Sequence, residues 1–162
     1  MLARFLAALF LALIPAAAPA ETSTQPLIYV MRHLNTPAGE RDPDLLPEGR
    51  ETAEALAAWF PADAQPTVIY VSDFKRTRQT AAPLAARLGL TPVVYDPADT
   101  PALVARVQAE RGPVLIVGHS NTVPDIVAAL GGTRPAALVH EDFGEIWRVT
   151  PDGATARARI AQ

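Results

Sequence analysis

Short runs of apolar, β-prone residues alternate along this chain with longer stretches of helical periodicity. Strands that are apolar throughout are covered on both faces, and strands that alternate with helices form mostly parallel sheets. The alternation therefore predicts an α/β fold, a three-layer sandwich with helices on both faces of a mostly parallel sheet. The apolar runs are residues 27–31, 67–71, 92–95 and 114–117. The expected helices are residues 47–60, 76–89, 100–112 and 123–130.

Proline and glycine mark several of the expected helix ends. Pro47 is placed to be a first helical residue, Gly89 to be a C-cap, and Thr100 with Pro101 to be a cap and a first residue. Pro83 falls inside its helix, where proline is expected to introduce a kink.

The last two β-prone runs, at 145–150 and 155–160, flank the turn sequence Pro151-Asp152-Gly153. This pattern predicts a hairpin. Because a hairpin joins antiparallel strands, we expect it to add them at one edge of the sheet.

The first twenty residues have the pattern of a secretory signal peptide. Arg4 precedes a ten-residue apolar run, and Ala18-Pro19-Ala20 offers small residues at the cleavage position. The run is too short for a membrane span, which needs about 20 residues. We therefore expect a signal peptide at 1–20, a flexible lead-in at 21–26 and one domain at 27–162, in a periplasmic or secreted protein without a stable membrane anchor.

Composition excludes several classes of function. The chain contains no cysteine, which rules out disulfides, thiol catalysis and thiolate zinc sites. Its formal net charge is −3 with no long basic run, which argues against a nucleic-acid partner.

The suggestive polar residues come directly after the predicted strands. Arg32 and His33 follow the first strand, the segment 72–80 follows the second, and the segment 119–122 follows the fourth. The carboxyl ends of parallel strands meet at one edge of a sheet, where ligands bind. These residues are therefore expected to converge on one site.

The residue types at these positions suit a phosphoryl group. Arginine presents a planar set of donors that matches phosphate oxygens, and a protonated histidine adds positive charge. A second, neutral histidine is a competent nucleophile toward phosphorus. Cations at a helix N-terminus oppose the helix dipole, so the basic cluster Lys75, Arg76 and Arg78 is expected to have an anionic partner.

Other interpretations have weaker support. A metal site of His33, His119 and a carboxylate lacks any His-Glu-x-x-His spacing. A serine hydrolase using Ser72 or Ser120 lacks the Gly-x-Ser-x-Gly elbow. His140 is expected to be a solvated loop residue.

Four segments together resemble the histidine phosphatase superfamily, which has the phosphoglycerate mutase-like fold. They are Tyr29-Val30-Met31-Arg32-His33, Leu46-Pro47-Glu48-Gly49-Arg50, the stretch 70–81 with Ser72-Asp73-Phe74-Lys75-Arg76-Thr77, and Val117-Gly118-His119-Ser120-Asn121-Thr122. Each segment is modest alone, but their combination in this order is specific.

The resemblance implies a role for each site residue. His33 is the residue to be phosphorylated, Arg32, Arg76 and His119 complete the phosphate pocket, and Thr36 and Asn121 contact substrate. The implied protein is a phosphomonoester hydrolase that forms a phosphohistidine and needs neither metal nor cofactor. Its expected substrate is a phosphorylated small molecule or an envelope sugar phosphate.

The chain departs from the family pattern at two points. Leu34 stands where the family has glycine, so it must adopt an ordinary backbone conformation and either narrow the pocket or fill a packing space. The acid that protonates the leaving group is not evident. The candidates are Asp96 and Asp99, with Glu40, Asp42, Asp44, Glu141 and Asp142 also open. These departures motivate an alternative function, a non-catalytic phosphate- or ligand-binding module of the same fold.

Overall fold

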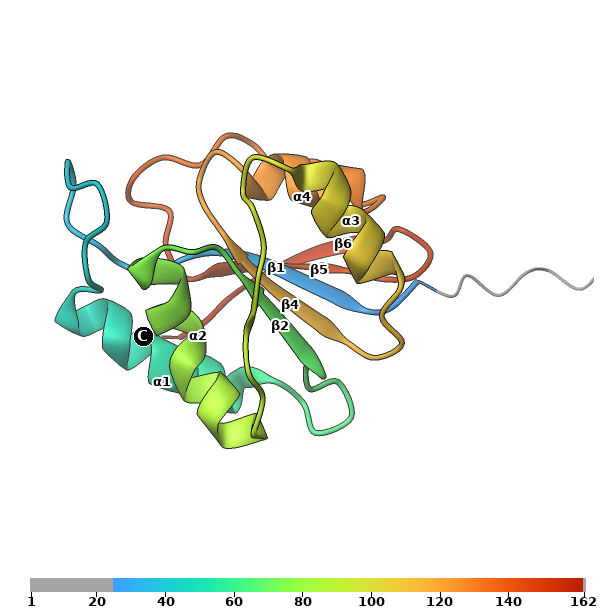
Figure 1. Cartoon of the computed structure of the whole chain (residues 1–162), viewed down its shortest axis with the longest axis horizontal. Helices are drawn as coiled ribbons and strands as arrows, with labels where there is room; N and C mark the ends of the chain where they lie inside the picture. The colour runs from blue at the N-terminus through green and yellow to red at the C-terminus, as the bar shows by residue number, and fades with distance from the viewer. Residues whose placement is uncertain (1–24, 162) are drawn as a thin grey trace, which may run out of the picture.

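A computed structural model describes residues 25–161 and shows one six-stranded sheet between two layers of helices (Figure 1). The predicted signal peptide at 1–20 lies outside the described residues. Within residues 25–161, no helix is long and apolar enough to cross a membrane. The strands are β1 (Ile28–Arg32), β2 (Val68–Val71), β3 (Val93–Val94), β4 (Val114–Gly118), β5 (Glu145–Val149) and β6 (Thr155–Arg159). The helices are α1 (Pro47–Trp59), α2 (Lys75–Leu88), α3 (Thr100–Gln108) and α4 (Val123–Ala129).

The strand order is β3-β2-β4-β1-β5-β6. The first four strands in this order are parallel, and the β5–β6 hairpin adds two antiparallel strands beside β1. The predicted α/β sandwich with a mostly parallel sheet and a C-terminal hairpin is confirmed. The loops after β1, β2 and β4 therefore leave the sheet at the same edge.

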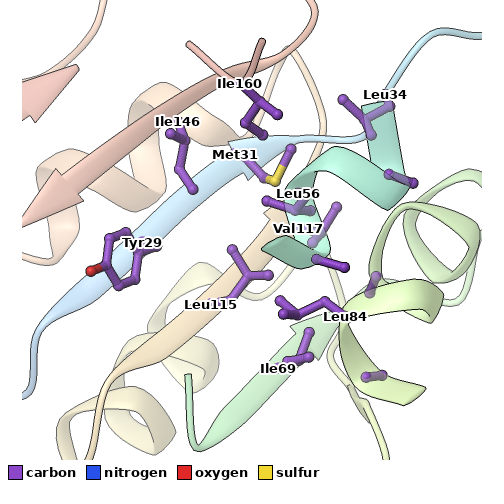
Figure 2. Close-up of a cluster of buried hydrophobic side chains, with 14 of the residues drawn as sticks. Tyr29, Met31, Leu34, Leu56, Ile69, Leu84, Leu115, Val117, Ile146 and Ile160 are labelled. Atoms are coloured by element: carbon purple, nitrogen blue, oxygen red, sulfur yellow. The ribbon is translucent and has the colours of Figure 1, made fainter. Parts of the chain in front are cut away.

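The side chains of the sheet divide the hydrophobic core into two parts. Tyr29 and Met31 of β1 pack with residues of α1 and α2, and Figure 2 shows this cluster. Ile28 and Val30 point to the other face and pack with residues of α3 and α4. Because both faces are covered, all five residues of β1 are buried, which explains its uninterrupted apolar run.

The helix ends agree with the sequence signals except at α3. Pro47 begins α1, and Gly89 ends α2 in the left-handed conformation with φ 65°. The predicted cap Thr100 is wrong, since it is already the first residue of α3. The cap is Asp99, whose carboxylate accepts a hydrogen bond of 3.0 Å from the amide of Ala102.

Leu34 fills a packing space and does not narrow the site. Its side chain is fully buried in the cluster between the sheet and α1–α2 (Figure 2). Its amide donates a hydrogen bond of 3.0 Å to Oγ1 of Thr80 in α2. No non-glycine residue between 25 and 161 has a positive φ, so Leu34 has an ordinary backbone. Leucine here anchors the start of the loop after β1 to the core.

Replacing Leu34 with alanine removes this anchor. We expect Leu34→Ala to lower the free energy of unfolding by about 2–5 kcal/mol, because it leaves a cavity in a fully buried cluster. Urea denaturation measures the change. Val139→Ala is the control, since Val139 is 60% exposed and its truncation should change stability by less than about 0.5 kcal/mol. Equal stability of wild type and Leu34→Ala would contradict this packing role.

Candidate active site

The two histidines that follow β1 and β4 lie together at one edge of the sheet. Arg32 pairs with Gly118 in the parallel register, so the next residues, His33 and His119, are neighbours across the strands. The amide of His33 extends this ladder by donating to the carbonyl of Gly118 at 2.9 Å. The two imidazole centroids are 5.5 Å apart. Both rings are buried, and they form the base of the site.

The hydrogen bonds of His33 define its tautomer. Its Nδ1 lies 2.9 Å from the carbonyl oxygen of Leu34, which can only accept, so Nδ1 carries the hydrogen. Nε2 is then left with a free lone pair. Burial lowers the pKa of His33 to about 3, and the charges of Arg32 and Arg76 act in the same direction. His33 is therefore a neutral imidazole with its nucleophilic nitrogen available near neutral pH.

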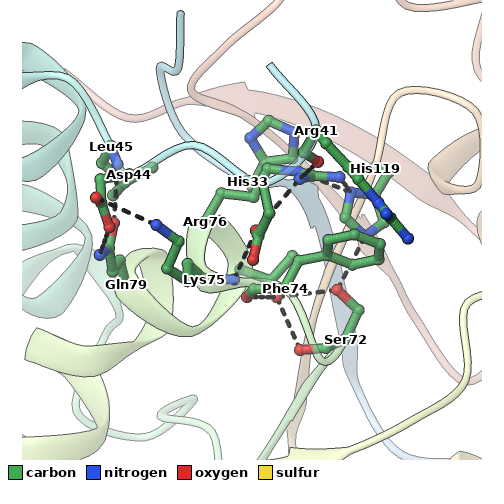
Figure 3. Close-up of polar contacts among 12 residues, drawn as sticks. His33, Arg41, Asp44, Leu45, Ser72, Phe74, Lys75, Arg76, Gln79 and His119 are labelled. Atoms are coloured by element: carbon green, nitrogen blue, oxygen red, sulfur yellow. Dashed lines mark hydrogen bonds and ion pairs between the residues drawn. The ribbon is translucent and has the colours of Figure 1, made fainter.

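His119 has the opposite tautomer. Its Nδ1 lies 3.4 and 3.3 Å from Nε and Nη2 of Arg76, which can only donate, so Nδ1 is the acceptor. Its Nε2 then carries the hydrogen and donates it to Oγ of Ser72 at 2.9 Å (Figure 3). Burial, followed by the charge of Arg76, lowers the pKa of His119 to about 4. His119 is therefore neutral in the free site near neutral pH, and the expected protonated histidine stays a prediction for the site with a phosphoryl group bound.

Arg32 is held by the loop between α4 and β5. Its Nη1 donates to the carbonyls of Val139 at 2.7 Å and His140 at 3.0 Å, with Asp142 at 3.4 Å. Its guanidinium carbon lies 4.1 Å from the ring centroid of Phe143. Its Nε is buried and has no hydrogen-bond partner among residues 25–161. Neutral groups thus fix Arg32 through Nη1, while its other donors remain for an anionic ligand.

Arg76, in the first turn of α2, is positioned by the loop that precedes α1 (Figure 3). Its Nη1 donates to the carbonyl of Arg41 at 3.1 Å and lies 3.6 Å from the carboxylate of Asp42. Its guanidinium carbon lies 4.3 Å from the ring centroid of Phe74. These contacts hold the guanidinium beside both histidines.

The other cations of this helix have partners within the chain. Lys75 pairs with Asp44 at 3.3 Å, and Arg78 pairs with Asp73. The predicted anionic partners of these two residues are therefore carboxylates of this chain. Only Arg76 of the cluster lines the site.

Two hollows meet at Arg76. One has a volume of about 170 Å³ and the other of about 290 Å³. Four of the predicted site residues line the smaller hollow, and three line the larger one. The smaller hollow is lined by Arg32, His33, Thr36, Arg76 and His140, with residues 37–40 and Pro43. The larger hollow is lined by Phe74, Arg76, Pro97, Ala98, His119, Asn121 and Thr122.

The two first-ranked candidates for the acid are engaged elsewhere. The carboxylate of Asp99 caps α3, and that of Asp96 accepts from the amide of Ala98 at 2.9 Å. Neither residue lines a hollow. Among the carboxylates of residues 25–161, Glu40 alone lines one of these two hollows.

Four residues of the site were not predicted from the sequence. Ser72 lies in a segment that the motifs included, and its position directly after β2 was an available signal. Phe74 follows in the same segment, where it supports Arg76. His140 and Phe143 come from a loop more than 100 residues from Arg32, and no local pattern indicates their contact with it. His140 is an exposed loop residue, as predicted, and it also lines the smaller hollow.

The donor set of the site suits an oxyanion and does not suit a metal ion. Two guanidinium groups, two imidazoles and the hydroxyl-bearing Thr36 surround the smaller hollow and its border with the larger one. Between residues 25 and 161, no group of three or more histidine, aspartate or glutamate residues is arranged to hold a metal. Guanidinium groups recognise phosphate through paired hydrogen bonds.

Comparison with known proteins supports this description. Residues 28–98 match the family model of the histidine phosphatase superfamily (branch 1). The match includes Arg32, His33, Thr36 and Arg76. No curated protein matches the chain by sequence.

Solved structures share the fold over most of their length. The protein histidine phosphatase SixA complexed with tungstate has a TM-score of 0.63 at 22% identity, over 82% of this chain and 94% of SixA. A mycobacterial glucosyl-3-phosphoglycerate phosphatase has a TM-score of 0.63 at 16% identity, over 82% and 97%. Its complex with inorganic phosphate has a TM-score of 0.59 at 19% identity, over 84% and 97%.

These neighbours show that the chain has the phosphoglycerate mutase-like fold. Residues 28–98 are thus similar to the histidine phosphatase superfamily, and the neighbours share the fold of the chain.

The lowered pKa values of both histidines predict their titration. In the ligand-free protein, His33 and His119 should remain neutral down to about pH 4, where His119 titrates first. Adding phosphate should raise both pKa values, because an anion favours the charged imidazole. Histidine side-chain NMR signals followed from about pH 3 to pH 8 measure both pKa values, because this range spans the lowered values and the ordinary pKa of histidine. Titration of either free imidazole near pH 6.5 or above would contradict the buried, arginine-flanked geometry.

The same shifts predict acid sensitivity of the fold. In the unfolded chain histidine takes up a proton near pH 6.5, whereas the folded pKa values are about 3 and about 4. The unfolded state therefore binds more protons within this window, and the stability contributed by these residues is lost as pH falls through it.

Proposed function

We propose that this chain is a metal-independent phosphomonoester hydrolase that works through a phosphohistidine at His33. One observation carries the proposal: Nε2 of His33 keeps its lone pair beside two guanidinium groups. The hydrogen bond from Nδ1 to Leu34 fixes this orientation. Phosphatases among the structural neighbours, and the tungstate and phosphate that two of those structures contain, support it.

In the first step, Nε2 of His33 attacks the phosphorus atom of a bound phosphomonoester. An N–P bond forms, the P–O bond to the leaving group breaks, and the leaving oxygen takes its electron pair and a proton. Arg32 and Arg76 lie where negative charge spreads over the non-bridging oxygens, and the bound anion raises the pKa of His119 so that its imidazolium adds positive charge. Such fixed groups stabilise the transition state.

In the second step, water attacks the phosphorus atom of phosphohistidine. A P–O bond forms, the N–P bond breaks, and the electron pair returns to Nε2 of His33. The water gives up one proton, and inorganic phosphate leaves. His33 is then again the neutral imidazole that its pKa of about 3 requires.

The substrate in this proposal is a phosphorylated small molecule or an envelope sugar phosphate. The structure contributes an open site, because loops and not an inserted domain surround the two hollows within residues 25–161. The envelope setting rests on the signal-peptide pattern at 1–20, which also makes a periplasmic or secreted location part of the proposal.

Phosphatase assays with purified mature protein test the proposal. We expect turnover of 4-nitrophenyl phosphate by the wild type, unaffected by EDTA. His33→Ala should lower kcat by at least about 10³-fold, since it removes the nucleophile on which both steps depend. A spectrophotometric rate assay measures both effects.

Glu110→Gln serves as the control variant, because Glu110 bonds to Tyr70 outside both hollows. Folded wild-type protein that binds phosphate but hydrolyses no phosphomonoester would refute the proposal and favour the non-catalytic binding module. Activity abolished by EDTA would refute the metal-independent mechanism.

A further inference from the structure

We propose that His140 is the catalytic acid and base of the proposed phosphoryl transfer, a role that none of the predicted carboxylates fills. The inference rests on the proposed function of the site. Its first support is position: His140 lines the smaller hollow together with His33, Arg32 and Arg76. His140 is exposed, so its ring is accessible to a bound ester and to water.

The backbone of His140 is fixed by the same arginine that precedes the nucleophile. Nη1 of Arg32 donates to the carbonyl of His140 at 3.0 Å and to that of Val139 at 2.7 Å. The carboxylate of Asp142 closes the turn by accepting from the amide of Val139 at 2.7 Å. The loop that carries His140 is therefore tied to the end of β1, directly beside His33.

The ring of His140 is also oriented. It meets the ring of Phe143 edge to face, with centroids 5.4 Å apart and an interplanar angle of 82°. The ring of Phe143 also lies near the ring of His33, with the two centroids 6.0 Å apart. Phe143 in turn packs against the guanidinium of Arg32. The ring of Phe143 thus lies beside both the proposed acid, His140, and the nucleophile, His33.

Glu40 is the competing group on the same hollow, and its chemistry is less suitable. Its segment, residues 38–41, is exposed, as His140 is, so the two groups differ in chemistry and not in access. A carboxylate beside a dianionic phosphate adds like-charge repulsion, whereas a phosphate dianion stabilises a protonated imidazole. An imidazole can donate a proton in one step and accept one in the next, as the two steps of phosphoryl transfer require.

The proton balance of the two steps follows. When His33 attacks phosphorus, the imidazolium of His140 transfers its proton to the departing oxygen, which leaves as an alcohol. Neutral His140 then accepts a proton from the attacking water as the N–P bond breaks. Phosphate is released, and the imidazolium is restored for the next substrate.

Leaving-group dependence tests the role of His140. A poorly acidic alcohol needs a proton to depart, whereas 4-nitrophenolate does not. We expect His140→Gln to reduce kcat/KM for glycerol 2-phosphate by at least about 100-fold, but for 4-nitrophenyl phosphate by less than about 5-fold. Steady-state kinetics of wild type and variant on both substrates give the two ratios.

Two control variants distinguish the kinetic effect of His140 from that of neighbouring residues. Glu141→Gln changes an adjacent residue of the same loop that does not line the hollow, and Glu40→Gln removes the competing carboxyl group. The inference is overturned if His140→Gln slows both substrates equally, if it slows neither, or if the selective loss appears in Glu40→Gln instead. In each of these cases, wild-type turnover that depends on His33 leaves the proposed function standing. Wild-type protein inactive on both substrates would overturn the proposed function and this inference together.

Discussion

The pairing of Arg32 with Gly118 in the parallel ladder between β1 and β4 is the constraint on which the site depends. It aligns the ends of two buried strands, so that His33 and His119, the residues that follow, lie side by side. The hydrogen bond from the amide of His33 to the carbonyl of Gly118 continues the ladder by one residue. A shift of the register by one residue would turn each side chain to the opposite face of the sheet and separate the imidazoles.

The electrostatics of the site follow from how its arginines are held. Arg32 contacts backbone carbonyls and a phenyl ring, and Arg76 contacts a carbonyl, a phenyl ring and one partly exposed carboxylate. Most of these partners are neutral, so the positive charge is only partly compensated. Burial, together with this positive charge, lowers the pKa values of His33 and His119 and keeps both unprotonated. The site thus joins a neutral nucleophile to a cationic surrounding, a combination suited to a phosphate ester.

The layers of the fold were predictable because each depends on local patterns. Apolar runs identify the buried strands, and proline and glycine mark helix ends such as Pro47 and Gly89. The cap of α3 was predicted one residue late, because Asp99 and Thr100 are adjacent residues that both suit a cap. The sequence also could not decide between the two expected roles of Leu34, which the structure resolves in favour of packing.

The candidate site was predictable only where its residues follow strands. Arg32, His33, Arg76 and His119 could be assigned to one edge of the sheet because they follow strands that the alternation with helices predicts to be parallel. The contacts of His140 and Phe143 with this edge depend on how the loop after α4 crosses the sheet, which no short-range pattern specifies. The tautomers and lowered pKa values likewise arise from burial and from partners such as Ser72, which tertiary structure supplies.

Identification of the phosphorylated atom tests the central claim most directly. The wild-type protein is mixed with excess phosphomonoester, quenched in alkali, in which phosphohistidine survives, and mapped by peptide mass spectrometry. The account predicts one phosphorylated residue, His33, with the phosphoryl group on Nε2 and no label in His33→Ala. Label on His119 or Ser72, or turnover with no covalent phosphoenzyme, would contradict it.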